Sequence, residues 1–140
     1  MIENSIIKTE ISKKFPEATF EEFRGMLSVI IDQKKILDLM RFLDGHPQFP
    51  FDYLTDITAV DYLKQDREPR FDLVYHLYTF KQNQRLRVKL KVNEEEMEID
   101  SVSGIWKAAL WLEREVFEMF GFNFAGHPDL RRLLLPDVFD

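Results

Sequence analysis

The sequence feature that most constrains the fold is a predicted helix over residues 105–120 whose apolar side chains surround most of its circumference. On a helical wheel they cover an arc of roughly 200°, whereas a helix that covers one core needs a stripe of about 100°. The apolar members are Ile105, Trp106, Ala108, Ala109, Leu110, Leu112, Val116, Phe117, Met119 and Phe120. Such a helix is usually buried on two sides, so we expect one side to pack on its own domain and the other to contact a partner protein.

One charged residue interrupts the apolar arc: Glu113 lies between Phe120 and Trp106 on the wheel. A carboxylate in this position must be paired, or its pKa must rise until it is neutral. The nearest cations along the sequence are Arg131 and Arg132, so an intrachain salt bridge is the first interpretation. A salt bridge to an arginine of a partner and a role in proton transfer are the alternatives.

The polar side of the same helix carries Arg114 and Glu118 at the i,i+4 spacing of an exposed ion pair. Trp111 also falls on this side. Tryptophan is a frequent anchor of protein interfaces, although a single exposed aromatic residue needs no such explanation.

After the helix, the sequence predicts a glycine break and then an extended arm. Gly126 permits a tight turn, and Pro128 and Asp129 suit the first turn of a short helix. The leucines at 133–135 then precede Pro136. On a free monomer these leucines would add to an exposed apolar patch, so we expect the arm to dock on another protein.

A gap-free pattern of charges, glycines and aromatic residues runs through the helix and the arm. It consists of Glu113, Arg114, Glu115, Glu118, Met119, Phe120, Gly121, Gly126, His127, Pro128, Asp129, Leu130, Arg131, Arg132, Leu133, Leu134, Leu135, Pro136 and Asp137. This pattern resembles the signature of the subunit lettered C in respiratory complex I, the thirty-kilodalton hydrophilic subunit of the NADH:quinone oxidoreductases. Weaker landmarks at residues 51–54, 60–62 and 75–78 extend the resemblance over most of the chain.

The resemblance implies a structural subunit without a redox centre or catalytic centre of its own, in a complex that couples respiratory electron transfer to ion translocation. NADH, FMN, the Fe–S clusters and quinone would be bound by partner subunits. The chain would lie in the peripheral arm, on the cytoplasmic side of the membrane or the matrix side in an organelle. It would pack against the large hydrophilic subunit near the quinone site, with Fe–S subunits nearby.

The same resemblance leaves open the equivalent subunit of a membrane-bound nickel–iron hydrogenase or of a formate-hydrogen-lyase-type complex. The docking residues that it implies are Glu113, Arg114, Glu115, Glu118, Phe120, Gly121, Gly126, His127, Pro128, Asp129, Arg131, Arg132, Leu134 and Pro136. A hypothesis from a different class is a stand-alone small enzyme that uses Glu113 and His127 as acid and base.

Composition is consistent with one domain over residues 1–140, divided into a core at 1–103 and the signature helix and docking arm at 104–140. The net charge of −6 argues against general nucleic-acid binding. The absence of cysteine excludes disulfides, cysteine-type zinc sites and cysteine-ligated Fe–S clusters. The first residues lack the pattern of a signal peptide, and no apolar run reaches the roughly 20 residues that span a bilayer. We therefore expect contact with a membrane only through partner subunits.

Periodicity in residues 1–103 predicts an α+β domain of two layers, with a largely antiparallel or mixed sheet covered by helices on one face. The expected order is helix, two strands, helix, three strands. The expected ranges are a helix at 2–15, strands at 20–23 and 27–31, a helix from the N-cap Asp32 to Gly45, and strands at 54–62, 71–80 and 85–92.

The strand at 85–92 alternates most clearly, because Leu86, Val88, Leu90 and Val92 face one side and Arg85, Arg87, Lys89 and Lys91 the other. The cationic row is interpreted first as a solvated face and alternatively as a landing patch for an acidic partner. The acidic run at 94–98 is expected to be a solvated loop. None of the three histidines, His46, His76 and His127, has the spacing of a metal-binding pair, and we expect His76 to be a hydrogen-bonded structural residue.

Overall fold

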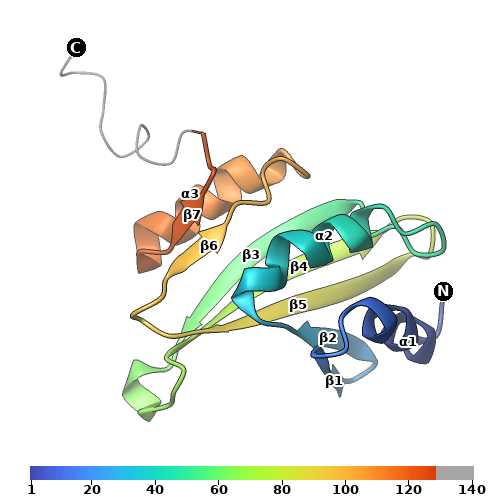
Figure 1. Cartoon of the computed structure of the whole chain (residues 1–140), viewed down its shortest axis with the longest axis horizontal. Coiled ribbons are helices and arrows are strands. Elements are labelled where there is room, and N and C mark those ends of the chain that lie inside the picture. Colours follow the sequence, from blue (N-terminus) through green and yellow to red (C-terminus); the bar gives the residue numbers. More distant parts are fainter. Residues whose placement is uncertain (129–140) are drawn as a thin grey trace.

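A mixed sheet of five strands forms the centre of the protein, whose computed structural model describes residues 1–128 (Figure 1). The strands are β1 (Thr19–Phe23), β2 (Met26–Ile30), β3 (Tyr53–Asp61), β4 (Phe71–Thr79) and β5 (Gln84–Val92). They lie in the order β1-β2-β5-β4-β3, in which β2 and β5 are parallel and the other neighbours are antiparallel. The predicted α+β class with a mixed sheet is therefore confirmed.

Helices α1 (Asn4–Lys14) and α2 (Ile36–Asp44) lie against one face of this sheet (Figure 1). The carboxylate of Asp32 accepts a hydrogen bond of 2.8 Å from the backbone N–H of Lys34, so it caps the 3-10 turn η1 (Gln33–Lys35) that leads into α2. The apolar face predicted for α2 is buried in full: Ile36, Leu39, Met40 and Leu43.

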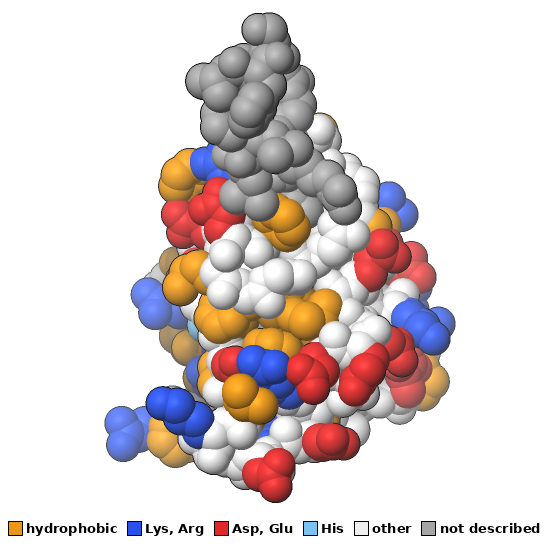
Figure 2. Space-filling view, turned by 90° about the vertical axis from the view of Figure 1, so that its left-hand side faces the viewer, with side chains coloured by type: hydrophobic (Ala, Val, Ile, Leu, Met, Phe, Trp, Pro, Cys, Tyr) orange, Lys and Arg blue, Asp and Glu red, His pale blue; other side chains and the backbone are white. Residues whose placement is uncertain are grey.

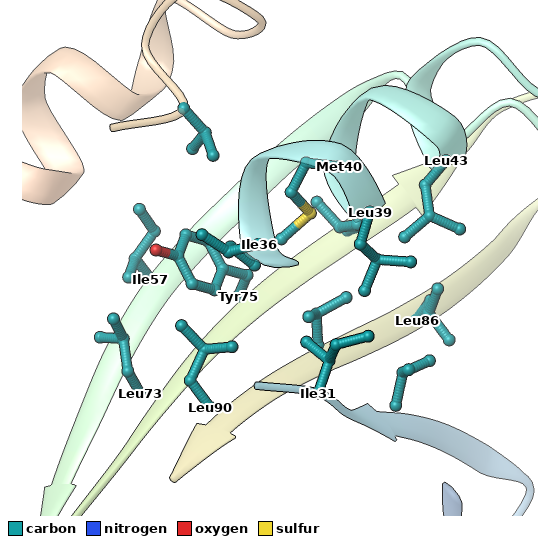
Figure 3. Packing of buried hydrophobic residues seen from close by; sticks show 14 of the residues in the cluster. Ile31, Ile36, Leu39, Met40, Leu43, Ile57, Leu73, Tyr75, Leu86 and Leu90 are labelled. Atoms are coloured by element: carbon teal, nitrogen blue, oxygen red, sulfur yellow. The ribbon is translucent and has the colours of Figure 1, made fainter. Parts of the chain in front are cut away.

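The hydrophobic core lies between this face of the sheet and the helices that cover it. Figure 3 shows residues of α2 facing Tyr75 on β4 and Leu86 and Leu90 on β5. The alternation predicted for β5 is confirmed, because its apolar members are fully buried and its cationic row points to the opposite face. Within residues 1–128 no helix covers that opposite face, which we call the open face (Figure 1).

Helix α3 (Ala108–Phe120) packs beside β3 at the edge of the covered face. It begins later than the predicted start at residue 105. The reason is a tight turn in which the backbone N–H groups of Ile105 and Trp106 both donate to the carbonyl of Val102. None of the helices in the described part of the chain is long and apolar enough to cross a membrane.

A second, two-stranded sheet was not predicted from the sequence. Strand β6 (Glu98–Asp100) pairs in parallel with β7 (Asn123–Ala125), which follows α3. The expectation that residues 94–98 form only a loop is therefore wrong at Glu98, where β6 begins. Strands of three residues are too short to show periodicity, and in β6 only Ile99 is buried.

His46 and His76 both form hydrogen bonds within the domain. On the open face, the ring Nε2 of His76 lies 3.2 Å from the hydroxyl of Thr58, which confirms a hydrogen-bonded histidine there. His46 is buried, and its Nδ1 accepts hydrogen bonds of 3.1 and 3.3 Å from the backbone N–H groups of Gln48 and Phe49.

The buried hydroxyl of Tyr75 generates a stability prediction. Tyr75 has no exposed surface, and no group in residues 1–128 forms a hydrogen bond with its oxygen. Because a buried polar group without a partner costs about 1–3 kcal/mol, we expect Tyr75→Phe to raise the free energy of unfolding by about 1 kcal/mol, measured by urea unfolding.

Tyr62→Phe is the matched control, since it removes the same atom from a hydroxyl that donates to Asp72 at 3.0 Å. We expect this control to lower the free energy of unfolding by about 1 kcal/mol. Two tyrosine variants that lose stability equally would contradict the assignment of an unpaired hydroxyl to Tyr75.

Candidate docking site

The carboxylate of Glu113, in the middle of α3, is completely buried and holds the loop that precedes the helix. Ser101 donates a hydrogen bond of 2.6 Å from its hydroxyl, and Val102 donates one of 2.8 Å from its backbone N–H. The Ser101 hydroxyl also lies 2.8 Å from that of Ser103. Glu113 therefore fastens loop 101–103 to α3, which makes it a clamp inside the domain.

The sequence correctly indicated that Glu113 needs a partner, but it did not identify Ser101 and Val102. The serines just before the helix were the available signal, because serine hydroxyls and backbone N–H groups commonly bind carboxylates. Arg131 and Arg132, the cations first considered, lie outside the described residues. A partner's arginine would have to displace loop 101–103 to reach the enclosed carboxylate.

Burial raises the pKa of Glu113 to about 7, while its hydrogen bonds to Ser101 and Val102 act in the opposite direction. Burial also raises the pKa of the Tyr75 hydroxyl, and the charges of Glu113 and Asp100 add to that shift. The junction of α3 with the core is thus a place where negative charge is disfavoured.

The outer side of α3 presents two large apolar side chains to solvent. Trp111 is 56% exposed and Met119 is 74% exposed, and the exposed carboxylates of Glu115 and Glu118 lie between them on the helix. The ion pair predicted between Arg114 and Glu118 is not among the salt bridges of the described chain. The Arg114 guanidinium lies instead over the Trp111 ring, 4.1 Å from its centre, which orients the indole.

The opposite side of α3 is inside the domain. Ala109 and Val116 are buried, and Phe120 is half-buried with its ring centre 6.4 Å from that of Phe71 on β4. The prediction of two apolar sides is therefore met only in part. One side is buried in the domain, whereas the outer surface is formed by Met119 and by Trp111, which the helical wheel placed on the polar side. We call these two side chains the α3 edge.

The glycine break after α3 has the predicted turn geometry. Gly121 ends the helix with φ of 84°, a left-handed conformation that glycine adopts without strain, and its N–H donates to the carbonyl of Phe117. Gly126 forms the turn after β7 with φ of 88°. The ring Nε2 of His127 then lies 2.8 Å from the carbonyl oxygen of Leu110, so the turn is held against α3.

The described geometry does not bring Glu113 and His127 together as an acid–base pair. Glu113 binds loop 101–103, whereas His127 contacts the backbone of Leu110. The remaining implied docking residue of the described chain, Pro128, is exposed. Five implied docking residues lie outside the described residues: Asp129, Arg131, Arg132, Leu134 and Pro136.

Figure 2 shows the side of the molecule that includes the C-terminal end of α3. Hydrophobic side chains gather in the middle of this face, and acidic and basic side chains surround them. An apolar centre with a charged rim is the usual arrangement of a protein interface.

Known respiratory proteins are similar to this chain in sequence. Residues 29–140 match the family model described as the 30 Kd subunit of respiratory-chain NADH dehydrogenase. The chain is 42% identical to the subunit lettered C of the NADH-quinone oxidoreductase of Geobacter sulfurreducens, over 98% of this chain and 84% of that protein. It is 40% identical to the same subunit of Roseiflexus sp. strain RS-1, over 97% and 78% of the two chains.

Two solved structures share the fold. One is the trypsin-resistant fragment of Nqo5, with a TM-score of 0.77 and 30% identity over 89% of this chain and 98% of that one. The other is a chain of the membrane-bound sulfane sulfur reductase, described as an archaeal respiratory membrane complex. It has a TM-score of 0.79 and 28% identity over 99% of this chain and 78% of that one.

The raised pKa of Glu113 generates a pH prediction. Because its pKa rises from 4.5 to about 7 on folding, the folded chain holds this proton more tightly than the unfolded chain. The resulting stability is full below the unfolded pKa and is lost as the pH rises through about 7, a change on the order of 3 kcal/mol. We expect Glu113→Gln to remove this slope, measured by urea unfolding between about pH 5 and 8.

Wild type should therefore lose stability relative to Glu113→Gln as the pH rises. Glu115→Gln, on the exposed side of the same helix, is the control and should follow the wild-type profile. Parallel profiles for wild type and Glu113→Gln would show that the carboxyl group keeps its ordinary pKa.

Proposed function

Because the chain belongs to the family of the 30 kDa subunit of respiratory-chain NADH dehydrogenase, we propose that it is a structural subunit of the peripheral arm of an NADH:quinone oxidoreductase. The observation that carries the proposal is 42% identity to the Geobacter sulfurreducens subunit over 98% of the chain and 84% of the relative. Similarity that covers most of both proteins favours the role of the whole subunit over a shared fold alone.

The partner proposed for the α3 edge is the large hydrophilic subunit beside the quinone site. Trp111 and Met119 are the largest apolar side chains that α3 exposes, and buried aromatic anchors contribute most of the energy of many interfaces. The flanking carboxylates of Glu115 and Glu118 favour a partner surface with cations around an apolar pocket. We also propose that this partner is contacted by five residues beyond the described part of the chain: Asp129, Arg131, Arg132, Leu134 and Pro136. The Fe–S subunits are proposed as further neighbours.

The chain itself is proposed to hold no redox centre. It has no cysteine, and cysteine thiolates are the usual ligands of Fe–S clusters. NADH, FMN, the Fe–S clusters and quinone would then be bound by partner subunits, and this subunit would contribute assembly and positioning. Its place would be the cytoplasmic side of the membrane, which it would reach only through those partners.

A second candidate is the equivalent subunit of another membrane-bound respiratory complex. The observation that favours it is the similarity to a chain of the sulfane sulfur reductase, which covers 99% of this chain. Identity is 28% to that chain and 42% to the Geobacter sulfurreducens subunit, which favours the NADH:quinone oxidoreductase.

Assembly in the native host tests the proposal. We expect Trp111→Ser combined with Met119→Asp to reduce copurification of the chain with the large hydrophilic subunit by about tenfold or more, since interface anchors contribute about 2 kcal/mol each. The thermal stability of the isolated chain should change little, because both side chains are largely exposed.

Leu63→Asp is the control, because Leu63 is 60% exposed on the turn η2 (Leu63–Gln65), away from α3 (Figure 1). Normal assembly of the double variant would remove the α3 edge from the interface. Wild-type chain that never copurifies with a large hydrophilic subunit would refute the function itself.

A further inference from the structure

The open face of the sheet has a hollow of about 700 Å³ that is lined by residues of all five strands and of two turns. Tyr53 begins β3 and pairs with Tyr78 near the end of β4, and Tyr78 pairs with Arg85 at the start of β5. The β1–β2 turn brings Phe23 and Arg24 to the same hollow. We call the side chains that matter here the open-face patch: Phe23, Arg24, Tyr53, Phe80, Arg85 and Arg87.

Three aromatic side chains of the open-face patch are exposed to an extent that is unusual in a folded domain. Phe23 is 64% exposed, Tyr53 is 50% exposed and Phe80 is 65% exposed. The Phe80 ring lies 5.5 Å from that of Tyr53 and 4.8 Å from that of Tyr78, both edge to face. The rings of Tyr53, Tyr78 and Phe80 hold each other in place, so they present an ordered apolar surface that a partner could cover.

Three arginines line the same hollow, and among residues 1–128 none of them forms a salt bridge. Arg24 lies over the Phe23 ring at 5.1 Å. The Nε–H of Arg87 is buried without a hydrogen-bond acceptor in the described chain. A donor in this state is rare in folded proteins. A carboxylate that enters the hollow would satisfy it only after the Arg87 side chain turns its guanidinium outward.

The neighbouring charges show that this arrangement is local. Lys89, on the same face of β5, already pairs with Glu21 at 3.1 Å. Asp56 also lines the hollow, and one of its oxygens accepts the backbone N–H of Ile57 at 2.8 Å. Lys91, near the other end of β5, also forms no salt bridge within residues 1–128. What sets the aromatic end of the face apart is that its unpaired cations are arginines that lie beside exposed rings.

We propose that the open-face patch binds an acidic segment of a neighbouring protein that also carries an apolar or aromatic side chain. Carboxylates of this segment would pair with Arg85 and Arg87, and its apolar side chain would pack among Phe23, Tyr53 and Phe80. The inference rests on the proposed function in one respect, since the neighbour is another subunit of the same complex. It adds a second docking surface, on the face of the sheet opposite to the helices.

The charge pattern favours a protein segment over nucleic acid or an anionic membrane. Those polyanions bind broad basic surfaces, whereas this chain has a net charge of −6 and the patch is bordered by Asp56 and Glu21. A narrow cluster of arginines beside exposed aromatic rings matches a short acidic peptide segment with one apolar anchor.

Photo-crosslinking in the purified complex tests the inference. The full chain would carry p-benzoylphenylalanine in place of Phe80 and, as the control, in place of the similarly exposed Leu63. We expect Phe80→p-benzoylphenylalanine to form an adduct with a peptide of another subunit that is rich in Asp and Glu, identified by mass spectrometry. The control should not label that peptide.

Charge-reversal variants provide a second test of the inference. Arg85→Glu should lower the yield of that adduct by about tenfold, and Lys64→Glu, at an exposed cation elsewhere, should leave it unchanged. Changing the labelled acidic residue of the partner to arginine should restore the yield with Arg85→Glu, because the ion pair is then formed with its signs exchanged.

An adduct with lipid, with nucleic acid or with a second copy of this chain would overturn the inference, as would an intact complex without any adduct at Phe80. These results would leave the proposed function standing. A wild-type chain that does not copurify with other subunits would instead refute the proposed function.

Discussion

The hydrogen bonds of the buried Glu113 carboxylate join α3 to the loop that leads into it from the sheet. Glu113 holds Ser101 and Val102 against α3, and the backbone N–H of Ser101 donates at 2.8 Å to the carbonyl of Ala125 on β7. One short loop is therefore bound both to the helix and to the strand that follows the helix. This arrangement ties α3, β6 and β7 into one unit, which packs beside β3 through α3 and leaves Trp111 facing outward.

The two candidate docking surfaces carry charges of opposite sign, although the chain as a whole is acidic. The α3 edge combines Trp111 and Met119 with exposed carboxylates, whereas the open-face patch combines aromatic rings with unpaired arginines. The α3 edge lies in the helical layer of the domain, and the open-face patch lies on the opposite face of the sheet. A chain with two apolar surfaces of opposite local charge is suited to hold two different neighbours, and complementary charge discriminates between them. The net charge of −6 does not reveal that one of the two surfaces is locally basic.

Regular periodicity made most of the core predictable. The buried face of α2 and the alternation of β5 follow directly from residue spacing, and the structure confirms both. Long-range contacts were not predictable in the same way. The β6–β7 pair joins three-residue strands on either side of α3, and the open-face patch gathers residues from positions 23 to 87. Glu113 illustrates the difference. Its need for a hydrogen-bond partner was evident from the sequence, but the identity of that partner depends on the fold.

The Glu113 clamp works in either protonation state, which explains how a carboxyl group with a pKa of about 7 can hold a structural junction. When Glu113 is ionised, the Ser101 hydroxyl donates to it, and Ser103 can donate its hydroxyl to Ser101. When Glu113 is protonated, the directions reverse, so that Glu113 donates to Ser101 and Ser101 donates to Ser103. The N–H of Val102 donates to the other carboxyl oxygen in both cases. A change of pH therefore alters the stability of the junction without altering its geometry, because hydroxyl groups can exchange donor and acceptor roles.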